Sequence, residues 1–182
     1  MGVRILYRAG QFWRALTADP IQVDLAQARR LLSPSMMEVF LRLQPGEQAH
    51  SLWVFNQFCS QGETNHDLLV AALMHDVGKT CQSLKLWERV WIVLGKGLFQ
   101  QLANKWGMMK PNVWRRPFWV SENHAAWGAE MASQAGASPL SVSMIKRHHE
   151  PFLPEYPEET IDPDLGLENR LLRRLQLFDN RR

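Results

Sequence analysis

Residues 71–80, "AALMHDVGKT", end an apolar run with a histidine, an aspartate and a lysine. The run before them, residues 68–74, is apolar on every side, which predicts a helix at the centre of the core. A buried imidazole or carboxylate is costly unless it is paired or bound to a metal ion. Adjacent residues in a helix point about 100° apart, so His75 and Asp76 converge on one centre most easily at a helix end. The stretch therefore predicts a core helix that ends in a polar site.

Outward from this stretch, capping residues, prolines and glycines divide the rest of the chain into helices. No segment alternates at the period of two that is typical of a strand. The predicted helices are 33–43 (Ser33 followed by Pro34), 47–61 (ended by Gly62), 65–76, 84–102 (weakened by Gly95 and Gly97), 121–135 (capped by Ser121), 138–150 and 165–179. Proline-rich loops are expected at 110–119 and 150–164. The pattern predicts an all-α fold, a bundle of about six to eight helices.

Length and composition limit the class of protein. A chain of 182 residues, 46% of them apolar, can build one real core. We expect an N-terminal helical extension, residues 1–45, and one globular unit, residues 46–182. The net charge is +3, with basic and acidic residues interspersed, which suits a small anionic ligand and predicts no nucleic-acid partner. The oligomeric state stays open.

The location of the chain is inferred from its cysteines and its N-terminus. Cys59 and Cys81 are too few for a disulfide scaffold, which favours a reducing compartment. Arginines interrupt the N-terminal apolar segment, which argues against a secretory signal. The longest apolar candidate, from Leu84, carries several charges and falls short of the roughly 20 apolar residues of a membrane span. We expect a soluble, cytoplasmic protein.

Five of the six histidines lie in or at the end of predicted helices, with apolar residues three or four positions away. These are His50, His75, His124, His148 and His149. Asp179 continues the face of Leu172 and Leu175, where another apolar residue would be expected. A divalent ion would satisfy all of these polar groups together. His66, beside Asn65 at a helix start, is interpreted as a solvated neighbour of the cap.

This ordered set resembles the HD-domain superfamily of metal-dependent phosphohydrolases. The family pattern places a histidine on one helix, a His-Asp pair on a later helix and a distant aspartate, matched here by His50, "HDVGK" at 75–79 and Asp179. Members with two metal ions add one histidine and then a pair, matched by His124 in "ENHAAWGAE" and by "HHE" at 148–150. The resemblance covers residues from about 48 to 180 and implies an HD-domain helical bundle.

The resemblance also implies two divalent transition-metal ions, which would be Fe, Mn, Co, Ni or Zn. One ion would take His50, His75, Asp76 and Asp179 as ligands, and the other would take Asp76, His124, His148 and His149. Asp76 bridges the two sites in this scheme, because a carboxylate offers two oxygens. The nucleophile implied for hydrolysis is a metal-bound hydroxide.

Several basic residues are candidates for binding the phosphate of a substrate. Lys79 would neutralise a non-bridging oxygen and so act with Asp76 in catalysis, and Arg115, Arg116 and Arg147 would clamp the anion. A plainer interpretation of Lys79 is a helix-end cation that faces the helix dipole. The tryptophan-rich segment 87–119 is most simply core, although aromatic and arginine side chains together can also stack a base.

Three functions remain open from the sequence. The first is a phosphohydrolase that acts on a phosphomonoester or phosphodiester, of a nucleotide-like compound. The second is a di-iron oxygenase of the same superfamily, which shares a similar site of histidines and aspartates. The third is a non-catalytic, metal-stabilised binding module, with a weaker option of resting on a membrane through residues 84–102. Lys79 and the extra His149 favour the hydrolase.

Overall fold

The structure is a computed structural model of the chain, and it describes residues 25–151 and 163–180. The α-helices are α2 (Ala26–Leu31), α3 (Pro34–Leu41), α4 (Pro45–Ser60), α5 (His66–Met74), α6 (Leu86–Leu98), α7 (Gln100–Gly107), α8 (Arg116–Gln134), α9 (Pro139–Arg147) and α10 (Pro163–Asp179). A short 3₁₀ helix, η1 (Val77–Cys81), follows α5. The described residues contain no strand, and the all-α prediction is confirmed.

Local capping explains where several helices begin. Ser33 accepts a hydrogen bond from the backbone N–H of Met36 at 3.3 Å, and the helix opens on the proline at position 34. Ser138 caps α9 in the same way, through the N–H of Ser141 at 3.1 Å. Asn65 caps α5 through the N–H of Leu68 at 2.9 Å. Each of these side chains satisfies a backbone donor that has no partner in the first helical turn.

Two predicted helices are divided in the structure. The helix predicted over 65–76 ends at Met74, with His75 as its C-terminal cap, and the chain tightens into η1. The helix predicted over 84–102 is two helices, because the backbone leaves helical geometry at Phe99 with φ −137° and ψ 49°. The two glycines that weaken this segment precede the break by a few residues.

The prediction that Ser121 caps a helix was wrong. Helix α8 begins at Arg116, with Pro117 in its first turn, so Ser121 lies within the second turn. Proline at the start of a helix loses no hydrogen bond, and "RRPFW" therefore opens α8 instead of continuing the predicted loop. Of the loop predicted over 150–164, residues 163 and 164 belong to α10 and residues 152–162 lie outside the described residues.

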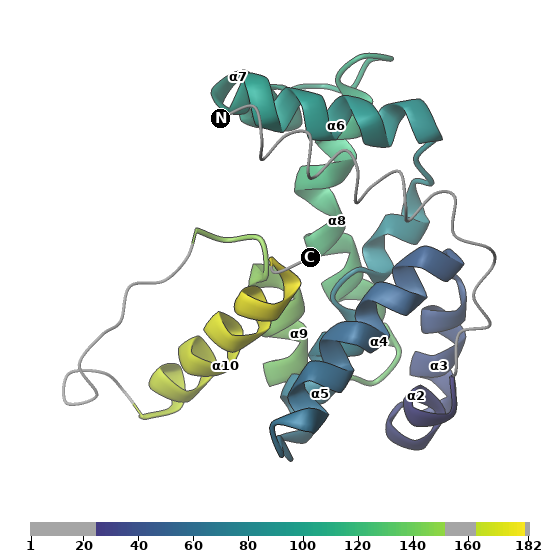
Figure 1. The fold of residues 1–182 in the computed structure, drawn as a ribbon, viewed down its shortest axis with the longest axis vertical. Coiled ribbons are helices and arrows are strands. Elements are labelled where there is room, and N and C mark those ends of the chain that lie inside the picture. The colour runs from purple at the N-terminus through teal and green to yellow at the C-terminus, as the bar shows by residue number, and fades with distance from the viewer. Residues whose placement is uncertain (1–24, 152–162, 181–182) are drawn as a thin grey trace.

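Helix α5 lies at the centre of the core, as predicted. Every residue from Leu68 to Met74 is buried. Figure 1 shows α4 and α5 in the middle of the molecule, with α2 and α3 on one side and α9 and α10 on the other. The long helix α8 extends away from this core to α6 and α7, which lie together at its far end (Figure 1). The bundle thus has a main core and a separate helical pair.

Helices α2 and α3 belong to the same core as α4 and α5. Ala28, Met36, Met37 and Phe40 are buried in one hydrophobic cluster with the residues of α5. Whether residues 46–182 fold without this contribution stays a prediction. Among the residues that the structure describes, no helix is both long and apolar enough to cross a bilayer.

Candidate metal centre

Asp76 lies at the middle of the site, just after α5 ends. It is buried, with 2% of its surface exposed, and so is the neighbouring His75. One carboxylate oxygen, Oδ2, lies 3.6 Å from Nε2 of His75, and the other, Oδ1, lies 3.5 Å from Nε2 of His124. The two oxygens of a single carboxylate therefore face two different groups of histidines.

The first group brings together three helices. His50 comes from α4, His75 from the end of α5 and Asp179 from the last residue of α10. Oδ1 of Asp179 lies 2.9 Å from Nε2 of His50 and 3.4 Å from Nε2 of His75. Donor atoms of His50, His75 and Asp76 all lie within 4.8 Å of one another, which is close enough for one ion to contact all three. We call these residues, together with Asp179, the first cluster.

The second group is made by α8 and the end of α9. His124 is a buried residue of α8, His148 is the C-terminal cap of α9, and His149 follows it. Donor atoms of these three histidines also lie within 4.8 Å of one another. Their ring centroids are 4.3–5.4 Å apart. We call them the second cluster, and Asp76 lies between it and the first.

The protonation of three rings follows from their backbone contacts. Nδ1 of His75 lies 3.0 Å from the carbonyl of residue 72, Nδ1 of His124 lies 2.9 Å from that of residue 121, and Nδ1 of His148 lies 2.7 Å from that of residue 145. A carbonyl oxygen can only accept a hydrogen bond, so each Nδ1 carries a proton. In the neutral ring, Nε2 is then left with a free lone pair, which is the arrangement of a metal-ligating histidine.

The Nε2 atoms of these three rings make no hydrogen bond. Nε2 of His75, His124 and His148 is buried without one. Orphaned polar atoms of this kind are rare in folded proteins and indicate a missing ligand. Neutral imidazoles and carboxylates together form a mixed nitrogen and oxygen set that suits divalent transition metals. The residues present therefore fit metal ions at both clusters.

Electrostatics in the first cluster favour a cation. Burial alone would lower the pKa of His75, but the carboxylates of Asp76 and Asp179 outweigh it and raise the pKa to about 9. Burial alone would raise the pKa of Asp76, but Lys79 and His75 hold it well below its usual range. Two ionised carboxylates, the buried Asp76 and the half-buried Asp179, create a negative potential, and either protons or a metal ion can neutralise it.

The second cluster favours neutral rings. Burial, followed by the neighbouring imidazole of His149, lowers the pKa of His148 well below its usual value. Burial and the ring of His124 also lower the pKa of His149, although this residue is exposed at the edge of the site. A histidine must be neutral to bind a metal ion, so no proton has to be displaced from these two rings at neutral pH.

Lys79 forms an ion pair with Asp76. Its Nζ lies 2.6 Å from Oδ2 of Asp76, and the lysine side chain as a whole is partly exposed. Burial alone would lower the pKa of Lys79, but the charge of Asp76 raises it. The lysine therefore remains a cation beside the two clusters, where it can meet an anionic ligand.

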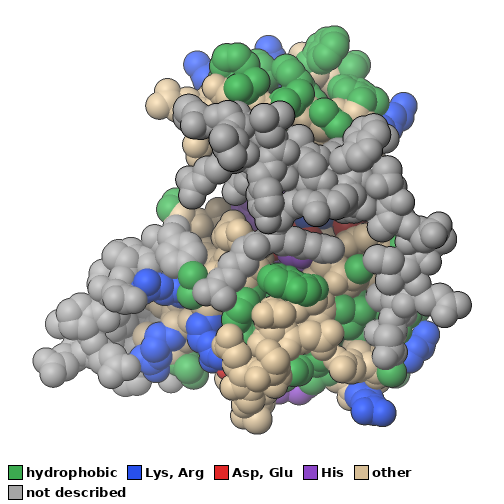
Figure 2. All heavy atoms as spheres, in the orientation of Figure 1, with side chains coloured by type: hydrophobic (Ala, Val, Ile, Leu, Met, Phe, Trp, Pro, Cys, Tyr) green, Lys and Arg blue, Asp and Glu red, His purple; other side chains and the backbone are tan. Residues whose placement is uncertain are grey.

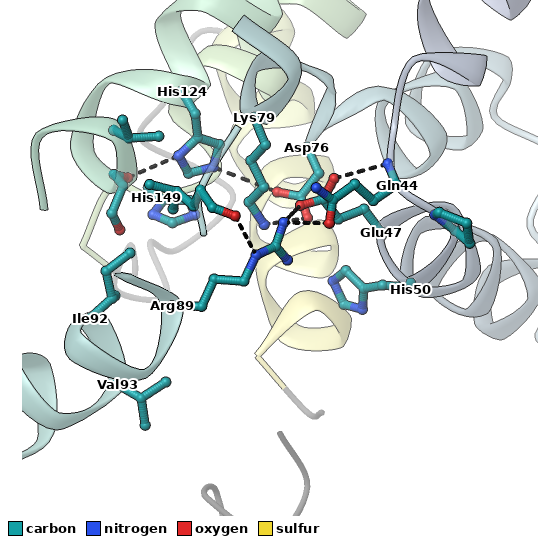
Figure 3. A pocket seen from close by; sticks show the side chains of 15 residues that line it. Gln44, Glu47, His50, Asp76, Lys79, Arg89, Ile92, Val93, His124 and His149 are labelled. Carbon is teal, nitrogen blue, oxygen red and sulfur yellow. Dashed lines mark hydrogen bonds and ion pairs between the residues drawn. The ribbon is translucent and has the colours of Figure 1, made fainter. Parts of the chain in front are cut away.

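A cavity of about 460 Å³ opens above these residues. Five of the predicted site residues line it: His50, Asp76, Lys79, His124 and His149. Figure 3 shows Arg89 reaching from α6 toward Glu47, beside two apolar side chains of the same helix, Ile92 and Val93. The cavity thus has a polar floor of ligands and basic groups and an apolar wall.

Sequence reasoning missed Arg89 and its partners. The guanidinium of Arg89 donates to Oε1 of Gln44 at 2.8 Å and to Oε1 of Glu47 at 2.9 Å. In the sequence, Arg89 is one of the charges that interrupt the apolar segment from Leu84. A charge within an apolar stretch was the available signal, but only the tertiary structure brings Arg89 of α6 to Glu47 of α4 at the cavity.

The other predicted arginines lie elsewhere. Arg116 is held by Glu88, with a shortest N–O distance of 2.5 Å, and Arg147 is held by Glu150 and Glu168. Neither of them lines the cavity, and neither does Arg115. Their role in binding substrate stays a prediction. The positions of these three side chains, outside the cavity lining, do not favour it.

Residues 48–176 match the sequence profile of the HD domain. The chain belongs to the HD-domain family. The match contains His50, the His-Asp pair and the three histidines of the second cluster, and it stops just before Asp179. Membership places the chain in a superfamily of metal-dependent hydrolases, and the two clusters supply residues that could hold the metal. Comparisons with curated proteins and with solved structures gave no match.

Proposed function

We propose that this HD-domain protein is a phosphohydrolase that cleaves a small phosphomonoester or phosphodiester. The observation that carries the proposal is the pair of histidine clusters with buried, unpartnered Nε2 atoms on either side of Asp76. Two metal sites that share one carboxylate are the arrangement that supports in-line displacement at phosphorus.

The metal ligands in this proposal are the seven residues predicted from the sequence. His50, His75, Asp76 and Asp179 would hold one ion, and Asp76, His124, His148 and His149 would hold the other. Both would be divalent transition-metal ions, drawn from Fe, Mn, Co, Ni and Zn. When bound, such ions lower the pKa of a water molecule and neutralise charge on the phosphoryl group.

The chain's own residues bind and orient the substrate. Lys79 lies beside Asp76 and lines the cavity, so its ammonium group can turn from that carboxylate to a phosphoryl oxygen. Arg89 is anchored to Glu47 at one edge of the cavity and adds a second cation. Ile92, Val93 and Val120 form an apolar wall that suits a base or another apolar part of the substrate. These features favour a small, nucleotide-like phosphoester.

A second candidate is a di-iron oxygenase. The same set of imidazoles and carboxylates also suits a pair of iron ions, and this observation keeps the candidate open. The cation beside the bridge, Lys79, favours the hydrolase, because an anion must be stabilised at that point during phosphoryl transfer.

The test is a reconstitution without oxygen. The full chain is loaded anaerobically with Mn²⁺, Fe²⁺, Co²⁺, Ni²⁺ or Zn²⁺, its metal content is measured, and phosphate release is followed on phosphomonoester and phosphodiester panels with and without O₂. We expect close to two ions per chain and turnover that is independent of O₂. His66→Ala serves as a control, because His66 lies at the start of α5, away from both clusters. Turnover that disappears without O₂ would favour the oxygenase.

A cytoplasmic location is also part of the proposal. Cys59 and Cys81 are free and exposed, and exposed thiols persist in a reducing compartment.

A further inference from the structure

Exposed large apolar side chains concentrate in one segment. They are Trp87, Leu98, Phe99, Leu102, Met108, Met109, Val113 and Trp114, which we call the apolar cap. Elsewhere in the described ranges, the comparable residues are Leu41, Leu167 and Leu177. Figure 2 shows the apolar side chains gathered at the end of the molecule where Figure 1 places α6 and α7. Contiguous apolar surface on a folded chain indicates a binding surface.

Helix α6 presents different faces to the cavity and to solvent. Successive residues in an α-helix advance by about 100°, so Arg89 and Ile92 lie far around the axis from Trp87. Leu98 returns to within about 20° of Trp87 by the same geometry. Arg89 and Ile92 line the cavity, whereas Trp87 and Leu98 are exposed. The apolar cap is therefore used neither by the cavity nor by the core.

The cap lies within a strongly basic segment. Residues 84–116 contain seven basic residues and one acidic residue, Glu88. Three of the basic residues pair with carboxylates, Arg89 with Glu47, Lys96 with Glu122 and Arg116 with Glu88. The other four are Lys85, Lys105, Lys110 and Arg115. Glu88 is buried and paired with Arg116. In Figure 2, Lys and Arg side chains lie at the margin of the apolar region. The surface thus combines apolar and aromatic side chains with positive charge.

We infer that the apolar cap docks on an anionic membrane surface, with α6 and α7 lying in the interface. Tryptophan settles at the level of lipid headgroups, and Trp114 has 65% of its surface exposed. Basic residues at the rim attract anionic headgroups. Helix α6 has 13 residues, too few to span a bilayer, so the contact is peripheral. A second copy of the chain is a poorer occupant, because two caps that both carry positive charge repel each other.

The inference does not depend on the chemistry of the cavity. Binding of the chain to lipid vesicles can be measured without any substrate. The full chain is mixed with vesicles of equal parts phosphatidylglycerol and phosphatidylcholine, or of phosphatidylcholine alone, and the bound fraction is measured by flotation. Brominated lipids then report contact with tryptophan through fluorescence quenching. We expect at least tenfold tighter binding to the anionic vesicles, with quenching, and weaker binding as salt is raised.

Matched variants locate the contact. Leu98→Gln with Leu102→Gln removes two apolar side chains from the cap, which are 57% and 42% exposed. Leu41→Gln with Leu177→Gln makes the same changes outside it, at positions 43% and 39% exposed. We expect the first pair to weaken vesicle binding at least tenfold and the second pair to leave it unchanged. Lys105→Glu with Lys110→Glu should abolish the preference for anionic lipid.

Three results would overturn the inference. The first is no binding to the anionic vesicles, and the second is equal loss in both leucine pairs. The third is a wild-type dimer, seen by analytical ultracentrifugation, that Leu98→Gln with Leu102→Gln converts to a monomer, because the cap would then be the contact between two copies. Far-UV circular dichroism of each variant confirms that a loss of binding does not come from unfolding.

Discussion

Gly78 packs directly against the backbone of His124. A Cβ atom added at Gly78 would overlap the carbonyl oxygen of His124 and lie 2.5 Å from the backbone nitrogen of Gly128. Helices η1 and α8 therefore touch through their backbones, and this contact brings the carboxylate of Asp76 within 3.5 Å of the His124 imidazole. The glycine of "HDVGK" thus sets the distance between Asp76 and the second cluster.

Gly78→Ala should separate η1 from α8. Forcing a methyl group into a packed contact costs about 1–3 kcal/mol of unfolding free energy. For a chain of this size, each kcal/mol lowers Tm by about 2–4 °C. We expect a lower Tm by circular dichroism, measured in chelator, and reduced metal content after reconstitution.

Gly46→Ala is the matched control for that change. A Cβ at Gly46 meets nothing within 4 Å, and the residue lies in the first turn of α4. This variant should leave Tm unchanged or raise it slightly. If the two alanine variants have the same Tm, the close packing at Gly78 does not limit stability.

Metal content should separate the bridging residue from a ligand of one cluster. Asp76→Ala removes the carboxylate that faces both clusters, so we expect it to lose both ions. His124→Ala should lose mainly the ion of the second cluster. Elemental analysis of anaerobically reconstituted protein gives the stoichiometry, and equal metal content in the two variants would contradict the bridge.

Lys79→Met should lower kcat and leave the metal content intact. A donor that stabilises charge in a transition state contributes roughly 10²–10³-fold to kcat. Lys79 contacts Asp76 but is not in either set of ligands, so both ions should remain. Steady-state kinetics on the best phosphoester substrate, together with elemental analysis, measures both quantities. A wild-type kcat in this variant would leave Lys79 as a structural partner of Asp76.

The arginine that lines the cavity should affect substrate binding. We expect Arg89→Met to raise KM for an anionic substrate several-fold without changing the metal content. The sequence hypothesis assigns that effect to Arg115→Ala with Arg116→Ala. Arg42→Met is a neutral control, because Arg42 forms an exposed pair with Glu38 and does not line the cavity. A larger KM effect in the Arg115 and Arg116 pair than in Arg89→Met would restore the sequence hypothesis.

Glu63 should contribute stability that depends on pH. Its carboxylate accepts a hydrogen bond from the backbone N–H of Asn65 at 2.7 Å and pairs with Arg174, and these contacts lower its pKa below the usual 4.5. Because the folded protein prefers the ionised form, the stabilisation is present above pH about 4.5 and is lost as the pH falls through the lowered pKa.

The comparison is made between wild type and Glu63→Gln by thermal unfolding in chelator. The variant should have a lower Tm at neutral pH, and the difference should narrow as the pH falls below about 4. Glu38→Gln, in an exposed pair, should show no such dependence. A difference in Tm that stays constant with pH would show that the ionisation of Glu63 is not the cause.

Local signals explain which helices the sequence predicted correctly. Ser33 and Ser138, each followed by proline, cap the helices they were expected to cap, because a cap needs only the next three residues. The apolar run in α5 is buried throughout, since a helix with no polar face has to be surrounded. The early start of α8 has a local signal, Pro117 in its first turn, but the prolines around it favoured a loop. The break at Phe99 comes after the two glycines that weaken the segment, and they do not mark its position.

The sequence by itself determined the helical class, the central position of α5 and the residues that carry imidazole and carboxylate groups. These depend on periodicity and on side-chain chemistry, which are local. Only the tertiary structure decided that Asp76 faces both histidine clusters, that Arg89 lines the cavity while Arg116 is held by Glu88, and that the apolar cap is exposed. The reason is physical: periodicity tells which face of a helix is apolar, but only the packing of the other helices decides what that face meets.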